Sequence, residues 1–350
     1  MLPYFILIAV ILISQIKVHK RSNQTYKLFL MFVGLFIFAA IRGSGSGDYF
    51  NYLIFSKYVT NFGDVASKSI PMEIGFRFMS YINNILGFHE QTVIAAMNFI
   101  SLLCTYKFIK KYSPDKVLSV LLFLPLFLQY DMHASRTAVA MGISLFSYPY
   151  LLERDLKKFV MWVALAATFH KSVFILLPMY FIAHIELDKV LGVLSIVGLA
   201  VLSQITSTTV IALNILRLMG LSSFASKVNA YMQSERFGYG FRIYDPRLLL
   251  VIGIYFVAKI VLDSSEKEQN ILINYAWINA LIMLFFIQHT ALVTRLSAYF
   301  NIYTIISIPY IITILKQKSG IKLGGPMKIA FVYTYLLYIG ALAWGMVDYK

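Results

Sequence analysis

The sequence predicts an all-α, polytopic integral membrane protein with about 12 transmembrane helices, within a range of roughly 10 to 13. The chain of 350 residues is 59% hydrophobic and only 13% charged, which is about half the charge of an ordinary soluble domain. Its mean hydropathy is +0.73. Apolar runs recur along the chain, and lysine-rich segments separate several of them. These observations exclude an ordinary soluble globular protein.

The apolar runs give the expected membrane spans in chain order. Several are shorter than the about 20 residues that a helix needs to cross a bilayer, so adjacent polar residues must complete the crossing. No internal repeat or low-complexity linker separates them, and we expect a single transmembrane domain over residues 1–350. The runs are residues 2–16, 28–41, 91–106, 117–130, 137–152, 159–169, 172–184, 190–206, 248–262, 271–288, 296–315 and 328–347.

Lysine-rich connections predict which loops face the cytoplasm. They follow the first, third, fifth and eleventh runs, and all of them alternate to one side of the membrane. Because positive residues concentrate in cytoplasmic loops, we expect both termini to face outward, together with two long loops, 42–90 and 207–246. Within the first loop, residues 73–88 are polar on one side, which favours an interfacial helix over a span. The cations are Lys17, Lys20, Arg21 and Lys27; Lys107, Lys110, Lys111 and Lys116; Arg154, Lys157 and Lys158; and Lys316, Lys318, Lys322 and Lys328.

On the outward side the cations are mostly arginine. A guanidinium can bind phosphate bidentately, whereas the ammonium of lysine is a point charge. This preference predicts recognition of phosphate. The net charge of +15 favours anionic lipid or phosphate partners over nucleic acid. The alternative is that the arginines only extend to the membrane surface. They are Arg42, Arg77, Arg136, Arg217, Arg236, Arg242, Arg247 and Arg295.

The segment 42–52 is a glycine-rich loop that follows an apolar run. Three alternating glycines separate Arg42 from Asp48, and Tyr49 and Tyr52 come after them. Glycine permits backbone angles closed to other residues, so the loop suits a phosphate or a sugar as well as a plain connector. It is not a Walker A loop, since no Gly-Lys-Ser/Thr follows.

Further polar clusters are expected at the outer ends of the spans. The run 159–169 covers only about half of a roughly 30 Å hydrocarbon core at about 1.5 Å per residue. His170 and Lys171 are therefore expected partly below the membrane surface, where polar groups usually have a function; a turn that meets lipid headgroups is the alternative. The clusters are 131–136 with His133 and Arg136, 170–172, 288–290 with His289, and Arg295 with Tyr299. Arg242 lies in an aromatic-rich loop, which suits either carbohydrate binding or an aromatic belt at the membrane surface.

Metal chemistry is not expected. The one cysteine, Cys104, excludes an intramolecular disulfide and a cysteine-based zinc site. No Asp-x-Asp motif is present, and Glu186 with Asp188 falls on the expected cytoplasmic side. Zinc held by scattered histidines is an alternative that no spacing favours. We expect neither a metal nor another cofactor.

Several of these motifs occur together in one family. They are Arg42-Gly-x-Gly-x-Gly-Asp48-Tyr49-x-x-Tyr52, Glu73-x-Gly75-Phe76, Arg136-x-x-x-Ala140, His170-Lys171-Ser172 and Arg295-x-x-x-Tyr299. In this combination, which extends over most of the chain, the sequence resembles the EpsG-type, Wzy-like polymerases of bacterial exopolysaccharide, capsule and O-antigen.

The resemblance implies a GT-C-like membrane glycosyltransferase in the bacterial cytoplasmic (inner) membrane, with its active site facing outward. It implies polymerisation of repeat units linked to undecaprenyl pyrophosphate: a growing glycan chain is transferred from its carrier to a second lipid-linked unit. The expected partners are these lipid-linked oligosaccharides and the membrane, with a polysaccharide chain-length regulator as a further candidate and no nucleic acid.

The expected site residues follow from the needs of such a reaction. A reaction that releases pyrophosphate needs cations for the departing charge and a base near the attacking hydroxyl. We expect Asp48, His170 and Arg136 to be catalytic, without metal. The expected substrate-binding residues are Arg42, Tyr49, Tyr52, His133, Lys171, Arg242, His289, Arg295 and Tyr299.

Two other functions stay open from the residues. A membrane O-acyltransferase of glycans would use a catalytic histidine, and His170 is in a suitable place. A flippase of lipid-linked sugars would favour internal repeats and cations in the middle of spans. The absence of a visible repeat and the gathering of cations at one face favour the polymerase.

Overall fold

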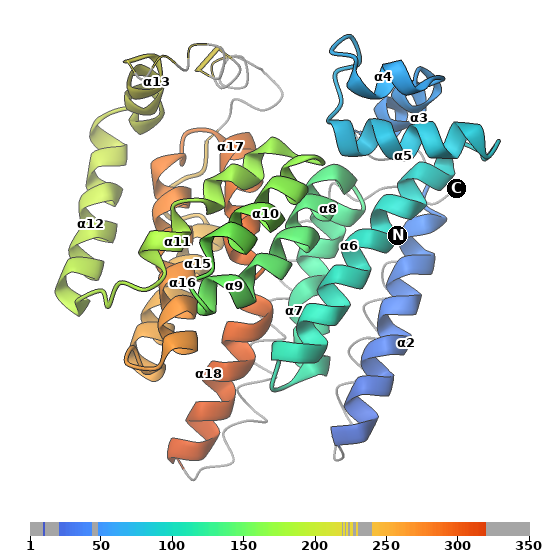
Figure 1. Ribbon diagram of the computed structural model, residues 1–350. Coiled ribbons are helices and arrows are strands. Elements are labelled where there is room, and N and C mark those ends of the chain that lie inside the picture. The colour runs from blue at the N-terminus through green and yellow to red at the C-terminus, as the bar shows by residue number, and fades with distance from the viewer. Residues whose placement is uncertain are drawn as a thin grey trace. The chain divides into compact units, whose positions relative to one another are not determined.

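The computed structural model describes residues 21–43, 48–218 and 240–319, together with residues 10, 220, 222, 225, 226 and 229. All regular secondary structure within these residues is helical, which confirms the predicted all-α class (Figure 1). The chain divides into two compact units: a first unit of residues 1–180 and 308–350, and a second unit of residues 181–307.

The first unit contains most of the predicted site. Its helices are α2 (Arg21–Ala40), α3 (Tyr49–Lys57), α4 (Phe62–Ala66), α5 (Ile74–Ile85), α6 (Gln91–Tyr112), α7 (Lys116–Leu126), α8 (Ser135–Ser144), α9 (Tyr148–Leu152) and α10 (Leu156–Ala167), with a π-helical turn η1 (Phe127–Asp131) and the 3-10 turns η2 (Leu145–Ser147) and η3 (Lys171–Leu176).

Aspartates begin several of these helices. The carboxylate of Asp115 accepts a hydrogen bond from the backbone N–H of Leu118 at 3.2 Å, and the carboxylate of Asp155 accepts one from that of Lys158 at 3.1 Å. Each carboxylate satisfies a donor that the first helical turn leaves without an intrahelical partner. The sequence thus marks the starts of α7 and α10.

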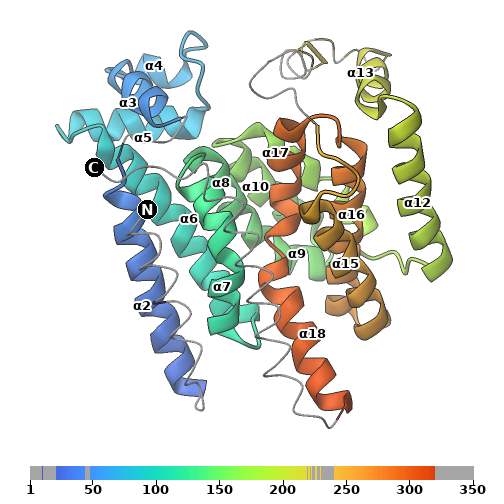
Figure 2. The same cartoon turned by 180° about the vertical axis from the view of Figure 1, so that it is seen from behind.

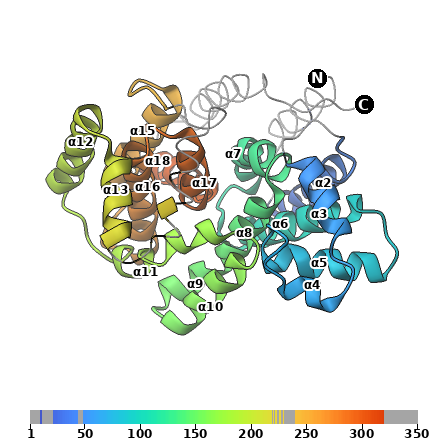
Figure 3. The same cartoon turned by 90° about the horizontal axis from the view of Figure 1, so that it is seen from above.

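Helix α6 is at the centre of the first unit. It packs against α2 and α8, and α10 packs against α8. Helix α7 also packs against α2. The view from behind shows α2, α6 and α7 of this unit (Figure 2). The short helices α3 and α4 rest on α5, and all three lie at the N-terminal end of α6 (Figure 3). Because the sequence predicts a membrane protein, we expect van der Waals contacts and hydrogen bonds between the helices, rather than removal of apolar surface from water, to stabilise this packing.

Pro125 explains the change of helix type near the site. It lies inside α7 and is followed at once by the π-helical turn η1. Proline lacks an N–H and its ring clashes with the carbonyl four residues earlier, so the regular hydrogen-bond ladder is interrupted there. Single π turns often occur at functional sites, and this one ends at Asp131.

The second unit is built around α16. Its helices are α12 (Lys189–Ile205), α13 (Thr208–Leu218), α15 (Pro246–Val261), α16 (Lys267–Phe285) and α17 (Thr290–Asn301); α11 (Met179–Ile182) and α18 (Thr304–Ser319) extend across the boundaries between the units. Helices α12, α15 and α17 all pack against α16. The side-chain amide of Asn274 donates to the carbonyls of Ala183 at 3.0 Å and Ile185 at 2.8 Å, which fixes the segment before α12 on α16.

Among the described helices, length and composition single out α6 as able to cross a membrane. Two bent pairs qualify as well if each counts as one span: α12 with α13, bent by 95°, and α17 with α18, bent by 51°. The predicted count of about 12 spans is not confirmed, because runs such as 137–152 and 172–184 are divided into short helical pieces. The runs 2–16, apart from Val10, and 328–347 lie outside the described residues.

The polar side of segment 73–88 faces the protein. In α5, the side chains of Arg77, Ser80 and Asn83 are buried. The side-chain amide of Asn84 donates to the carbonyls of Ser56 and Val59, both at 2.8 Å, and so holds α5 on the end of α3. Apolar side chains occupy the outer face, namely Ile74, Phe78, Ile82 and Ile85.

Candidate functional site

Arg42 is a buried clamp between α2 and the start of α8. Its side chain is 1% exposed. The Nη1 group donates to the backbone carbonyl of Asp131, and Nη2 donates to the hydroxyl of Ser135 at 2.9 Å. The hydroxyl of Ser135 in turn donates to the same Asp131 carbonyl at 3.2 Å. The guanidinium therefore joins the end of α2 to the π turn that precedes α8.

A row of polar residues on α6 supports this clamp. The amide of Gln91 donates to the carbonyls of Ala40 at 3.0 Å and of Arg42 at 3.2 Å, which holds the chain beyond α2 against α6. Ser101 lies beside the buried carboxylate of Asp131 and donates to the carbonyl of Ala138 at 3.1 Å.

These α6 residues belong to none of the motifs recognised in the sequence. Gln91, Asn98, Ser101 and Thr105 recur at helical spacings of seven, three and four residues inside an otherwise apolar run. Such a polar stripe indicates a face that packs against protein rather than lipid. This spacing is the sequence signal by which these residues could have been found. Asn98 is fully buried, and neither polar atom of its amide has a hydrogen bond within the described residues.

Arg136 and Glu73 form the second part of the site. Nη1 of Arg136 donates to Oε2 of Glu73, and the two side chains are 18% and 17% exposed. The Arg136 guanidinium also lies 5.7 Å from the ring centroid of Tyr52. A carboxylate and an aromatic ring thus fix the orientation of the planar guanidinium, while part of it stays accessible.

Asp48, Tyr49 and Tyr52 all belong to the first turn of α3 or directly precede it. The Tyr52 hydroxyl is 3.4 Å from the carboxylate of Asp48 and 3.4 Å from the backbone N–H of Arg136, which donates to it. Asp48 and Tyr49 are half-buried and Tyr52 is buried. The structure therefore brings together Asp48 and Tyr52 from the start of α3, Glu73 from the start of α5 and Arg136 from the start of α8, which are three separate segments of the sequence. Residues 44–47 of the glycine-rich loop lie outside the described part of the chain.

His133 lies in the short connection between η1 and α8. It is half-buried, and its burial, helped by the positive charge of Arg42, lowers the pKa of its imidazole to about 4. Since the charged form is disfavoured by both effects, His133 is neutral near pH 7 and acts there as a hydrogen-bonding group. Its place beside Arg42 agrees with the cluster predicted for residues 131–136.

A close contact at Gly75 joins α5 to the end of α10. The backbone N–H of Gly75 donates to the carbonyl of Thr168 at 2.7 Å. A methyl group at Gly75 would lie 2.9 Å from that carbonyl oxygen and 3.0 Å from the ring of Phe169. Glycine is required here by the close approach of two backbones. The contact places the Glu73 segment next to the turn that carries His170.

We expect Gly75→Ala to lower the free energy of unfolding by about 1–3 kcal/mol, because the added methyl group overpacks this backbone contact. Thermal unfolding of the detergent-solubilised variant measures the effect. Gly34→Ala is the matched control, since a methyl group at Gly34 on α2 meets no atom within 4 Å and alanine favours a helix. Equal stability of the two variants would contradict the packing at Gly75.

His170 and Lys171 lie at the junction of α10 and η3. His170 is half-buried and Lys171 is exposed. The Nδ1 atom of His170 is hydrogen-bonded to the hydroxyl of Ser172, so this atom caps the turn. The short run 159–169 is observed as the short helix α10.

Four predicted site residues belong to the second unit. The guanidinium of Arg242 donates to the hydroxyl of Tyr244 at 2.8 Å, and both side chains are exposed. The backbone N–H of Phe241 donates to the carbonyl of Ile287 at 2.6 Å, which brings the segment with Arg242 beside the one with His289. The remaining two, half-buried Arg295 and buried Tyr299, lie one turn apart on α17.

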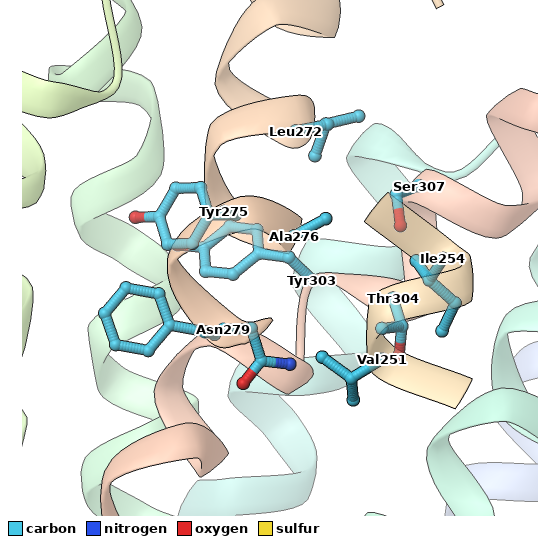
Figure 4. Close-up of a pocket in the computed structure, with 10 residues that line it drawn as sticks. Val251, Ile254, Leu272, Tyr275, Ala276, Asn279, Tyr303, Thr304 and Ser307 are labelled. Atoms are coloured by element: carbon cyan, nitrogen blue, oxygen red, sulfur yellow. The ribbon is translucent and has the colours of Figure 1, made fainter. Parts of the chain in front are cut away.

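A small cavity in the second unit does not contain any predicted site residue. It lies between α15, α16 and the bend from α17 to α18. There the rings of Tyr275 and Tyr303 stack with their centroids 3.9 Å apart, beside Asn279 and Thr304 (Figure 4). Its volume of about 10 Å³ suits about one water molecule. The cavity is therefore too small for a sugar or a phosphate.

The first-unit cluster can bind an anion and orient a hydroxyl. Arg136 is a partly accessible cation, and the side chains of Glu73, Asp48 and His133 carry atoms that can accept hydrogen bonds. Within the described residues, no three His, Cys, Asp or Glu side chains are grouped so as to hold a metal ion.

Comparison with known proteins gives one result. The profile of the EpsG family matches residues 25–350, so the match includes both units and every predicted site residue. No curated protein and no solved structure matches the chain.

Proposed function

The chain belongs to the EpsG family, and we propose that it polymerises repeat units carried on undecaprenyl pyrophosphate. Its family gives it a polymerase-type role in polysaccharide biosynthesis at the inner membrane. The specific reaction, the carrier, the GT-C-like architecture and the multi-pass topology of about 12 spans are parts of the proposal. The lysine-rich connections support an active site on the outer side.

The proposed reaction is a glycosyl transfer without metal. A sugar hydroxyl of the acceptor unit attacks the anomeric carbon of the donor chain. The new C–O bond forms as the bond between that carbon and the pyrophosphate oxygen breaks, and the electron pair leaves with undecaprenyl pyrophosphate. The hydroxyl proton passes to a nearby acceptor, for which Asp48 and His170 are the candidates. Positioning and charge stabilisation supply most of the rate enhancement, because pyrophosphate is a good leaving group.

The observation that carries this proposal is the Arg136–Glu73–Tyr52 arrangement. The guanidinium of Arg136 is held by a carboxylate and an aromatic ring and is still 18% exposed. An arginine fixed in this way can donate hydrogen bonds to a pyrophosphate oxygen without first losing side-chain freedom. Asp48, which is connected to Arg136 through the Tyr52 hydroxyl, is then close to the reacting bond.

The other predicted residues take supporting roles in the proposal. Arg42 is buried and bonded to protein groups, so we place it beneath the phosphate site, where it adds positive charge and fixes Asp131. Tyr49, His133 and Lys171 border the sugar and pyrophosphate. Within the second unit, Arg242, His289 and Arg295 are proposed to contact glycan, for which arginine side chains are suited. Tyr299 is buried one turn from Arg295 on α17, so its proposed role is to support that arginine.

The proposal is tested with purified protein and purified lipid-linked repeat units. We expect a ladder of products that differ by one repeat unit, and release of one undecaprenyl pyrophosphate for each bond formed. In sealed membrane vesicles, a water-soluble short-chain donor and acceptor added outside should be polymerised in right-side-out vesicles and not in inverted ones.

His170→Ala and His170→Gln provide the internal comparison for this assay. If the imidazole transfers the proton, both variants lose roughly 10²–10⁴-fold in rate. If it only positions the hydroxyl, the glutamine variant retains more activity. Unchanged repeat units in every reaction would reject a polymerase; their appearance in the opposite leaflet would then identify a flippase, and transfer of an acyl group to the glycan an acyltransferase.

A further inference from the structure

We propose that the exposed apolar row of α5 binds the isoprenoid tail of the lipid carrier. The row consists of Ile74, Phe78, Ile82 and Ile85 and is called the α5 row below. The inference rests on the proposed function for the identity of the carrier, and it adds the location at which the carrier's hydrocarbon chain leaves the pyrophosphate site.

The first support is that α5 buries its polar side and exposes its apolar side. Its apolar residues recur at intervals of four, four and three residues, which places them on one face of the helix. Phe78 is 48% exposed and Ile85 is 62% exposed, whereas Ser80 is fully buried. Exposed side chains of this size on a helix that buries its polar side require an apolar environment.

The second support is the position at which the row begins. Ile74 directly follows Glu73, and the Glu73 carboxylate holds Arg136. If the pyrophosphate of a lipid binds Arg136, the first isoprene units of that lipid lie beside Ile74. From there the row continues along α5 for eleven residues, or about 16 Å at about 1.5 Å per residue. One charged end and one continuous apolar face match an anionic headgroup with a long hydrocarbon chain.

The third support is the depth of α5 relative to α6. Helix α6 qualifies as a membrane-crossing helix and begins at Gln91, only a few residues after α5 ends at Ile85. Helix α5 lies across this end of α6 (Figure 1). With α6 crossing the bilayer, this end of α6 lies where headgroups adjoin acyl chains, and interfacial helices at that level place their apolar face toward the hydrocarbon. An ordinary bilayer lipid is the competing occupant. Its single phosphate carries less charge and fewer acceptor oxygens than a pyrophosphate, so Arg136 favours the carrier.

Site-specific photo-crosslinking distinguishes these two occupants. A benzophenone side chain replaces Phe78 in the full-length protein, which is placed in nanodiscs of phosphatidylethanolamine and phosphatidylglycerol with a small fraction of undecaprenyl pyrophosphate. Mass spectrometry then identifies the lipid attached to the protein. Phe29 is the matched control position, because it is 51% exposed and lies on α2 far from Arg42 along the helix.

We expect the carrier to be the main adduct at position 78 and a phospholipid to be the main adduct at position 29. Excess farnesyl pyrophosphate, which keeps the headgroup and a short chain, should compete with the carrier at position 78. The same ratio of carrier to phospholipid adducts at both positions would overturn the inference. This readout needs binding but no turnover, so it is independent of whether the protein polymerises.

The second test compares carriers of different length in the polymerisation assay. For Phe78→Ser, we expect KM for the undecaprenyl-linked unit to rise roughly 10- to 100-fold as one large apolar contact is lost, with kcat unchanged. KM for a unit on a very short prenyl chain should rise less, because that chain makes less contact with the row. Phe29→Ser should leave both values as in the wild type. An equal change for long and short carriers in Phe78→Ser counts against the α5 row, whereas absence of product with the wild type counts against the proposed function.

Discussion

We expect Arg136→Lys to lower the rate of polymer formation roughly 10²–10³-fold. This is the loss typical of removing one charge-stabilising donor from an active site. Lysine keeps the positive charge, but its ammonium cannot bind Glu73 and a pyrophosphate oxygen with the same planar geometry. It also loses the contact of the guanidinium with the Tyr52 ring. The initial rate of ladder formation from purified lipid-linked units, at equal protein concentration, measures the effect.

Arg247→Lys is the matched control for this substitution. Arg247 is also partly buried and pairs with an aspartate, since its Nη2 lies 2.8 Å from Oδ2 of Asp245, and its guanidinium lies 4.1 Å from the Phe241 ring centroid. It has the same kinds of contact as Arg136 but is outside the proposed site, so its replacement should change the rate little. If both lysine variants polymerise at the wild-type rate, Arg136 is a structural residue and the pyrophosphate site lies elsewhere.

Replacing Arg42 with alanine is expected to destabilise the protein rather than only its active site. Two hydrogen bonds from a charged donor are lost, each with a contribution of about 1.5–3 kcal/mol, and the Asp131 carbonyl and the Ser135 hydroxyl lose their common partner. We therefore expect the free energy of unfolding to fall by about 3–6 kcal/mol. Equilibrium unfolding in mixed detergent micelles measures this change.

Arg217→Ala gives the comparison for an arginine that is not buried. Arg217 is exposed on α13, and within the described residues its guanidinium makes a single long hydrogen bond, 3.5 Å, to the side-chain oxygen of Asn214. Its loss should change the free energy of unfolding by about 0.5 kcal/mol or less. An Arg42→Ala protein as stable as Arg217→Ala, but without polymerase activity, would instead place Arg42 in direct contact with the substrate.

The sequence predicted the helical class well but not the continuity of the helices. Hydropathy reports how apolar a run is, and it does not report where the hydrogen-bond pattern changes. The run 137–152 was expected as one span, and the structure divides it at the 3-10 turn η2. Pro125 was visible in the run 117–130, yet only the structure shows that a π turn follows it.

The same limit applies to the site. Arg136 and Glu73 were recognised separately, but 63 residues separate them, and no local pattern indicates that they form a pair. Gly75 was part of a motif, and its reason became clear only with the carbonyl of Thr168 against it. Asn98 and Ser101 do not stand out in the sequence, because single polar residues also occur in apolar helices that have no functional site.

The Arg42 clamp also has a consequence for the order of events during synthesis. Arg42 leaves the ribosome 89 residues before Asp131 and 93 residues before Ser135. At about 5–20 residues per second, that delay is about 4–18 s, which is long compared with the insertion of a helix into a bilayer. During this time the guanidinium has no partner in α7 or α8 and must stay hydrated at the membrane surface. The arrival of the nascent segment from α7 to α8 then draws it inward, whereas α9, α10 and residues 308–350, which also belong to the first unit, are added only later.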